Sequence, residues 1–520
     1  MIAEVIARLE EIVKYLKPLL PLANCHMVNF ITNGMWEIYV PDAIKKEFSS
    51  VKPEVFNTIF LHYAKEISMD KIKGELESVP NFANFLESAR NMCLRGISAQ
   101  GIVVSLSDLQ AKLAAWGYEY QESLHLEQFM TLKKVHEVEI MSQMVAALAC
   151  ISHASHVVDV GGGKGYLSSL LALHYGLRVL GVDSSHVNTH GAAKRTQKLE
   201  KRWNGLCQRT NILKQGDVPP CKGKHRKPHN NANSTKGCEC TGAEADINCR
   251  LQSESSALYK QVTMFVTQQT DLCSLVKDHF NSDRCEHLSI TGLHTCGDLA
   301  PACLRIFANK EECGSVSNVG CCYHLMEEEY VRSPFWTDTN PPLPTGVQPG
   351  FPVSKCLHMQ EFSLGRNARM LAAHSLDRIG EYHELSSESL FFRALLQVLL
   401  LKKCGNDIPW GQVGRLKYHN FVDYVQKAVK KLCLSIEVST DEIVSLYKTH
   451  SVEQQQLHVF FLLRVALAPV IEAVILLDRL LYLLEQGIQD SYLVQLFDPV
   501  ISPRCYCIVS LKNYPGKGTD

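Results

Sequence analysis

The chain has 520 residues, 46% of them hydrophobic and 21% charged, and a formal net charge of −1. This composition is that of a globular protein, and the length is sufficient for two or more domains. Proteins held to nucleic acid mainly by phosphate contacts usually carry a basic excess, which is missing here. Contact with RNA would therefore need a local basic patch. Residues 192–203 are one candidate, although such a run is more often the solvated face of a helix.

Residues 1–125 show helical periodicity and little strand signal, so we predict a helical N-terminal domain there. Residues 1–11 have the pattern of an acidic amphipathic helix, unlike the charged start and apolar core of a secretory leader. The 20 cysteines are scattered, and several, such as Cys150 and Cys433, lie in apolar runs. These features predict an intracellular protein, cytoplasmic or nuclear, with reduced thiols.

A strand, a glycine loop and a helix follow one another in the predicted core, residues 126–330. The run 157–160 is apolar except for Asp159, glycines occupy positions 161, 162, 163 and 165, and a helical pattern covers 166–173. Glycine lets backbone amides approach a ligand closely. The spacing differs from that of dinucleotide sites, because Tyr166 replaces the third glycine, and from that of P-loops, because Gly165 replaces Ser or Thr. The remaining pattern, acid-x-Gly-x-Gly-x-Gly, resembles the first motif of Rossmann-like methyltransferases that use S-adenosylmethionine (SAM).

A second acid supports this resemblance. The apolar run 177–182 ends in Asp183, which Ser184 follows. In a βαβ unit, an acid at the end of the second strand, about 20 residues beyond the glycine loop, accepts from a ribose hydroxyl. The resemblance further implies that Asp159 holds the loop and faces the amino-acid end of the cofactor. We therefore predict SAM as the cofactor, bound by these residues: Asp159, Gly161, Gly163, Gly165, Asp183 and Ser184.

Residues 219–256 interrupt the core with a polar composition that cannot bury apolar surface, and they predict a disordered loop. The segment contains four cysteines and two histidines, at Cys221, Cys238, Cys240, Cys249, His225 and His229. A zinc site is one interpretation. The absence of paired C-x-x-C motifs favours free thiols, so we expect no metal site.

Three further core strands are predicted, at 262–267, 287–293 and 315–320. Their alternation with helices predicts an α/β fold, a parallel sheet with helices on both faces. Because ligands bind at the carboxyl ends of such strands, the site also includes Asp271 and the segments 294–298 and 321–324. Asp271 is the last predicted cofactor-binding residue; it contacts the adenine edge or caps the following helix.

The predicted catalytic residues are His294, Asp298 and Cys322. His294 can act as a general base near neutral pH, or it is a histidine satisfied by the neighbouring loop. No Pro-Pro-aromatic sequence is present there, which weighs against adenine methylation. Cysteines after the fourth and fifth strands have the broad layout of RNA 5-methylcytosine enzymes, in which a thiolate adds to the ring. The Pro-Cys and Thr-Cys dipeptides of those enzymes do not match at Cys296 and Cys322, so a structural role for these thiols is favoured.

The C-terminal half contains a mostly helical insertion, residues 331–455, and a C-terminal segment, residues 456–520, that completes the core with a long helix and a strand at 504–511. The apolar run 458–484 is long enough to suggest a membrane span. Its charged and proline interruptions predict a buried helix and no membrane contact. These interruptions are Arg464, Pro469, Glu472, Asp478 and Arg479.

From about residue 125 to the C-terminus, the chain resembles the methyltransferase-like protein 25 family. The segments that carry this resemblance are 133–138, 159–168, 181–185, 293–299, 318–324 and 364–370. Those outside the glycine loop line an acceptor pocket or pack the fold, for instance Asn367 and Arg369 tying the insertion to the sheet. The resemblance implies a SAM-dependent methyltransferase. The lack of a basic excess favours a protein or ribonucleoprotein component as the unidentified acceptor. The alternatives are an RNA methyltransferase and a non-catalytic SAM-binding protein.

Overall fold

The computed structural model describes residues 1–65, 72–98, 101–120, 130–214, 258–281, 287–330, 346–383, 385, 388–405, 413–414 and 416–512. The chain forms two compact units. Unit 1 comprises Met1–Val103, Tyr323–Asp338 and Cys356–Asp478, and unit 2 comprises Val104–Cys322, Thr339–Lys355 and Arg479–Asp520. The predicted loop at 219–256 lies outside the described residues.

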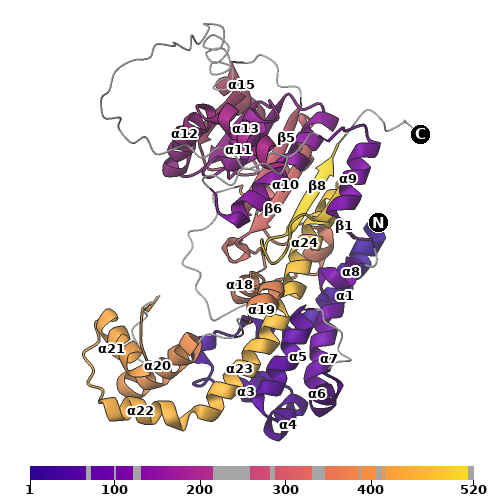
Figure 1. Ribbon diagram of the computed structural model, residues 1–520. Helices are drawn as coiled ribbons and strands as arrows, with labels where there is room; N and C mark the ends of the chain where they lie inside the picture. Colours follow the sequence, from indigo (N-terminus) through magenta and orange to yellow (C-terminus); the bar gives the residue numbers. More distant parts are fainter. Residues whose placement is uncertain are drawn as a thin grey trace, which may run out of the picture. The chain divides into compact units, whose positions relative to one another are not determined.

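Unit 2 is built on an eight-stranded sheet with the order β1-β7-β8-β6-β5-β2-β3-β4. Its neighbouring strands β5, β6 and β8 are labelled in Figure 1. Strands β2 to β6 run parallel, and β8 pairs antiparallel with β6 and with β7. The predicted α/β fold is confirmed. The strands are β1 Val103–Ser105, β2 His156–Val160, β3 Val179–Asp183, β4 Tyr259–Thr263, β5 Leu288–Cys296, β6 Cys313–Cys321, β7 Ser491–Gln495 and β8 Tyr506–Leu511.

Both faces of the sheet are buried. Val157 and Val179 join an apolar cluster with the helices on one face, while their chain neighbours Val158 and Leu180, which point to the other face, are equally inaccessible. This is the burial expected of a parallel sheet covered on two sides. The helices of unit 2 that the structure describes are α9 Leu106–Ala115, α10 Leu132–Ile151, α11 Tyr166–Leu173, α12 His186–Glu200, α13 Trp203–Lys214, α15 Leu272–Phe280 and α16 Leu299–Asn309.

One predicted strand needs correction, and two short strands were not predicted. The third core strand covers Tyr259–Thr263 and not 262–267, because its only partner, β3, ends at Asp183, which is in register with Thr263. The short strands β1 and β7 were not predicted. Each has five residues or fewer, which is too short for a clear alternation of apolar and polar residues. β7 also comes soon after an apolar helix, so its own apolar residues do not stand out.

Unit 1 is helical and joins the N-terminal region to the predicted insertion. Asn24 donates to the carbonyl of Leu364 at 2.7 Å, and Asn367 donates to the carbonyl of Asn24 at 2.9 Å. Asn367 therefore ties the insertion to the N-terminal segment, not to the sheet. The helices of this unit in the described ranges are α1 Ile2–Leu16, α2 Leu20–Asn24, α3 Met35–Tyr39, α4 Asp42–Ser50, α5 Pro53–Lys65, α6 Lys73–Ser78, α7 Pro80–Asn91, α8 Leu94–Ser98, α18 Arg366–Leu371, α19 Leu376–Tyr382, α20 Glu388–Cys404, α21 Phe421–Lys431, α22 Thr440–Thr449 and α23 Ser451–Ala466, with α17 Lys355–Met359 at its boundary.

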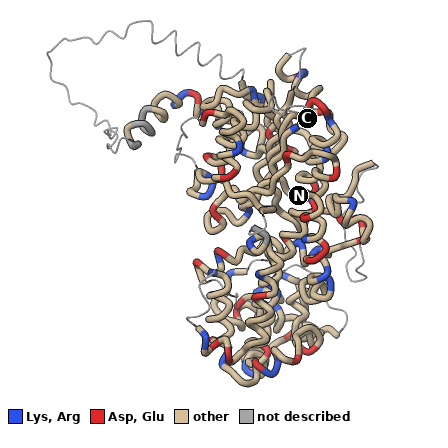
Figure 2. Tube along the Cα trace, turned by 90° about the vertical axis from the view of Figure 1, so that its right-hand side faces the viewer, with Lys and Arg blue, Asp and Glu red and all other residues tan. Residues whose placement is uncertain are grey.

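The predicted long helix is two consecutive helices, α23 and α24 (Ala468–Glu485). Together, residues Ser451–Glu485 are long and apolar enough to cross a membrane, but 89% of their most apolar window is buried inside the protein. This burial supports the interpretation of the run as core helices. Along the backbone of both units, Lys and Arg residues are mixed with Asp and Glu residues (Figure 2).

Candidate functional site

The glycine loop connects β2 to α11 at the point where the strand order reverses. From β2 the chain moves outward to β3 and β4, and it then returns to place β5 on the other side of β2. Ligands of open α/β sheets bind at the carboxyl ends of the strands at such a point. Gly161, Gly163 and Gly165 all have left-handed φ angles, of 75°, 54° and 70°. Residues with a Cβ adopt these angles only at a cost, which explains the glycines.

Asp183 fastens the loop to the neighbouring strand. Its carboxylate accepts hydrogen bonds from the backbone amide of Gly163 at 3.0 Å, the amide of Ser185 at 2.8 Å and the side chain of Asn188 at 3.0 Å. The adjacent Ser184 is exposed in the turn that leads to α12. A carboxylate has about four acceptor positions, so Asp183 can still accept from a ligand hydroxyl.

Asp159 supports the loop from inside the protein. Its side chain is 1% exposed and accepts a hydrogen bond from the hydroxyl of Ser168 on α11. Burial raises the pKa of Asp159 to about 6. A Cβ at Gly162 would lie 3.1 Å from the Asp159 carboxylate, so the loop is packed directly against this acid. The geometry agrees with the predicted role of Asp159 in holding the loop.

Asp271 caps helix α15. Its carboxylate accepts from the amide of Ser274 at 3.0 Å and from the hydroxyl of Ser274 at 2.9 Å. These two hydrogen bonds lower the pKa of Asp271. Of the two alternatives open at the sequence level, the hydrogen bonds support the helix cap; contact of Asp271 with adenine stays a prediction.

His294 lies in a bulge near the end of β5. The register between β5 and β6 shifts between Leu293 and Thr295, and His294 has a φ of 71°. A bulge changes the direction in which a side chain points, and bulges are frequent next to active sites. A residue other than glycine is strained in the left-handed conformation. The side chain of His294 is 26% exposed. The bulge therefore gives the imidazole of His294 a direction that a regular strand would not. His294 lies near the end of β5, where we predicted the acceptor to bind.

Glu137 of α10 holds the imidazole of His294. One carboxylate oxygen lies 3.0 Å from Nε2 of His294, and the other accepts from Ser502 at 2.7 Å. Burial by itself would raise the pKa of Glu137, but the hydrogen bonds from His294 and Ser502 and the charge of Lys134 outweigh it and lower the pKa to about 2. The ionised Glu137 favours the tautomer with the proton on Nε2, which leaves the lone pair on Nδ1. Nδ1 makes no hydrogen bond within the described residues.

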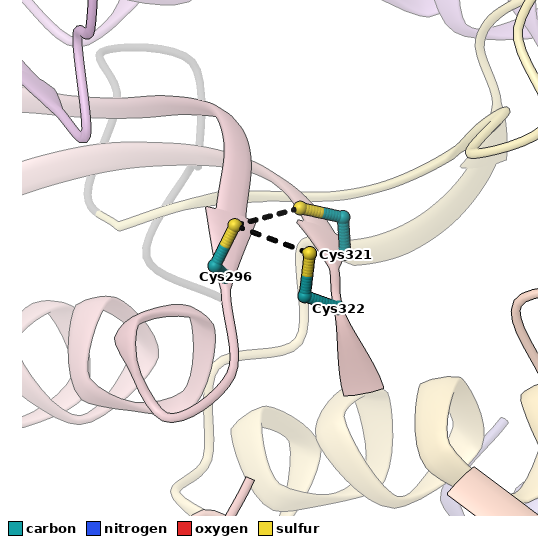
Figure 3. A group of neighbouring side chains, drawn as sticks. All are labelled: Cys296, Cys321 and Cys322. Carbon is teal, nitrogen blue, oxygen red and sulfur yellow. Dashed lines mark hydrogen bonds between the residues drawn. The ribbon is translucent and has the colours of Figure 1, made fainter. Parts of the chain in front are cut away.

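The other two predicted catalytic residues, Asp298 and Cys322, follow the strands β5 and β6. Asp298 precedes α16, and a Cβ at Gly350 would collide with its carboxylate, so the backbone passes very close to this acid. Cys322 follows β6 with a φ of 49°. Its sulfur lies 3.4 Å from that of Cys296, which in turn lies 3.2 Å from that of Cys321 (Figure 3). The hydrogen bond with Cys321 lowers the pKa of Cys296 to about 6, and the same bond raises the pKa of Cys321.

Some residues of the site were not among the predicted site residues. These are Glu137, Ser168, Asn188 and Ser502. Glu137 belongs to the segment 133–138 that carries the family resemblance, which was the one available signal for it. The hydroxyls of Ser168 and Ser502 had no such signal, because their partners Asp159 and Glu137 are identified only by the fold.

The candidate RNA-binding run 192–203 falls mainly on α12. Ala192, Thr196 and Leu199 form its buried face, and Lys194 and Lys198 are exposed. Arg195 stacks on the ring of Tyr166, 4.5 Å from its centroid, and donates to the carbonyl of Lys164 in the glycine loop. The run therefore forms the solvated face of a helix, which was the alternative to RNA binding. Arg195 of this face is bound to the glycine loop.

Residues 133–329 match the family model of a methyltransferase domain. Together with the sheet order and the glycine loop at the switch point, this match shows that the chain contains a methyltransferase domain, as predicted. A human protein named "Probable methyltransferase-like protein 25" is 32% identical to the chain, covering 98% of this chain and 97% of the human one. Its mouse counterpart is 31% identical and covers 97% and 96%. The chain therefore belongs to the methyltransferase-like protein 25 family, which confirms the resemblance. No solved structure shows a significant match.

Proposed function

We propose that the protein binds SAM over the loop 161–165 and transfers its methyl group to a nucleophile positioned beside His294. The observation that carries the proposal is the hydrogen bond of 3.0 Å between the Gly163 amide and Asp183, which holds the loop beside the acid at the end of β3. SAM supplies an electrophilic methyl group on a positively charged sulfur.

The residues of the loop fit this cofactor. A Cβ at Gly163 would meet no atom nearer than 3.8 Å, so space for a ligand lies directly against the backbone there. Asp183, at the end of β3, keeps an acceptor position for a ribose hydroxyl. The buried carboxylate of Asp159 packs against the loop at Gly162 and keeps it in place. Holding donor and acceptor in line is the main contribution that such a fold makes to methyl transfer.

His294 is the residue that handles the acceptor proton in this proposal. With Nε2 hydrogen-bonded to Glu137, the lone pair of Nδ1 accepts the proton that the acceptor loses as it takes up the methyl group. Among acceptors we favour a protein or ribonucleoprotein component, since the net charge of −1 provides no overall basic excess for holding RNA.

Gly163→Arg tests the cofactor site. The arginine side chain would fill the space against the loop, so calorimetry should show at least a 100-fold loss of SAM affinity. The matched control is Gly176→Arg, because Gly176 has a similar φ of 66° and open surroundings but lies away from the loop, between α11 and β3. Both variants carry the same backbone strain. Equal SAM affinity in the wild type and Gly163→Arg would overturn the assignment.

A further inference from the structure

Three cysteine sulfurs meet at the carboxyl ends of β5 and β6. The sulfur of Cys296 lies 3.2 Å from that of Cys321 and 3.4 Å from that of Cys322, and all three sulfurs lie within 4.8 Å of one another (Figure 3). In the part of the chain that the structure describes, this is the one group of three or more histidine, cysteine or acidic side chains whose ligand atoms are this close.

The backbone is shaped to bring these sulfurs together. After the bulge at His294, Cys296 is in direct register with Cys321, and register partners of neighbouring strands point to the same face of a sheet. The next residue, Cys322, would point to the opposite face if β6 continued, because strand side chains alternate. Instead β6 ends, and Cys322 adopts a φ of 49° that turns its sulfur back to Cys296. A residue with a side chain is strained in this left-handed conformation.

We propose that Cys296, Cys321 and Cys322 bind a thiophilic divalent cation of the zinc class. Zinc lies about 2.3 Å from each thiolate, and tetrahedral angles then separate two sulfurs by about 3.8 Å. The observed separations, from 3.2 Å to at most 4.8 Å, reach this value by small side-chain rotations. Binding releases the three thiol protons to solvent, because only the thiolates are ligands.

The surroundings suit a cation with three protein ligands. Three thiolates and a divalent cation have a net charge of −1, and the buried Arg504 supplies a nearby positive charge to Cys322. Cys296 is exposed, which gives the ion a path to the site and leaves a fourth position open. Three protein ligands and an open position are typical of catalytic zinc, in contrast to closed four-ligand structural sites. Water or a nucleophilic atom of the acceptor would occupy that position.

A disulfide is the competing use of these thiols. A disulfide would join only two of the three sulfurs, and its formation would need an oxidant. It would not explain why the strained backbone at Cys322 places a third sulfur beside Cys296. None of the three cysteines is among the residues proposed to hold SAM, since the glycine loop follows β2 and the sulfurs follow β5 and β6.

Cobalt(II) binding to the reduced, metal-free full chain tests the proposal. Cobalt replaces zinc and shows thiolate charge-transfer absorption. We expect the triple variant Cys296→Ser, Cys321→Ser, Cys322→Ser to bind one equivalent less than the wild type and to lose the matching part of this band. Cys150→Ser is the control, because it removes an exposed thiol of unit 2 outside the cluster. The single variant Cys296→Ser, at an exposed position, should weaken the site at least tenfold and serves if the triple variant does not fold.

Equal stoichiometry and equal absorption in the wild type and the serine variants would overturn the cation site. So would a disulfide between Cys296 and either partner in protein isolated under reducing conditions. SAM calorimetry separates this result from the cofactor proposal. We expect the triple variant to retain SAM binding and Gly163→Arg to retain the cobalt band, so that either proposal can fail without the other.

Discussion

At the scale of single residues, the pair Glu137 and His294 links a helix to the bulge of β5. Glu137 is 1% exposed, and the distance from its carboxylate to Nε2 of His294 is 3.0 Å. A carboxylate in this position orients the ring and fixes which nitrogen of the neutral imidazole carries the proton. In the proposed mechanism Glu137 is therefore a positioning residue, and His294 is the general base.

Glu137→Gln should slow methyl transfer by about 10²-fold or more. The glutamine amide can donate to Nε2 and so favour the tautomer with the proton on Nδ1, which removes the base. His294→Ala should have an effect of similar size, while Glu137→Asp, which keeps the carboxylate, should retain part of the rate. The measurement is the rate of label transfer from SAM, with SAM affinity as the control. A Glu137→Gln enzyme as fast as the wild type would assign the pair to structure alone.

Asp159 makes stability depend on pH. Burial raises its pKa from 3.8 to about 6, so between pH 4 and 6 the folded protein keeps a proton that the unfolded chain releases. The free energy of unfolding therefore falls as pH rises through this range, by about 3 kcal/mol for a shift of this size. Asp159→Asn cannot ionise and should lose this fall.

Urea denaturation at pH 4, 5, 6 and 7 measures the difference between Asp159→Asn and the wild type. Asp278→Asn, at an exposed acid of α15, is the control and should follow the wild type. If the two asparagine variants show the same pH dependence, Asp159 does not carry a raised pKa.

At the scale of elements, the loop between β2 and α11 packs tightly on β4. A Cβ at Gly165 would lie 2.6 Å from the hydroxyl of Tyr259 and 2.9 Å from Ala192. Gly165→Ala should lower the free energy of unfolding by more than the 1–2 kcal/mol or so of a left-handed alanine alone. Gly176→Ala, with a similar φ and open surroundings, should show only that smaller loss.

Adding Tyr259→Phe to Gly165→Ala removes the crowded hydroxyl and should recover part of the stability. Thermal and urea denaturation of the four proteins provide the comparison. Equal losses in Gly165→Ala and Gly176→Ala would show that the loop is not held against Tyr259.

The elements predicted from sequence are those with a local signature. β2, the glycine loop and β3 carry a local signature of apolar strand, glycines and terminal acid. The start of β2 was therefore predicted within one position, and β3 ends at Asp183 as predicted, although it begins two residues later than the apolar run at 177. The bulge at His294 and the left-handed Cys322 have no such signature, because they arise from the register of β5 on β6. For this reason the sequence places three cysteines near one sheet edge but does not predict that their sulfurs meet.

At the scale of the whole molecule, the contacts that sequence reasoning missed join distant parts of the chain. Glu137 and His294 are 157 residues apart, and Asn24 contacts a carbonyl 340 residues away. Local periodicity carries no information on such pairs. The N-terminal region and the insertion were accordingly predicted as separate helical segments, while the structure unites residues of both in unit 1.

The central claim is that this chain transfers methyl groups from SAM bound at the glycine loop. The most direct test adds purified protein and SAM with a tritiated methyl group to an extract of cells that lack the protein. We predict that the wild type and Gly176→Arg label a protein or ribonucleoprotein fraction and that Gly163→Arg does not. Absence of label with the wild type in protein, RNA and small molecules alike, or equal labelling by Gly163→Arg, would contradict the account.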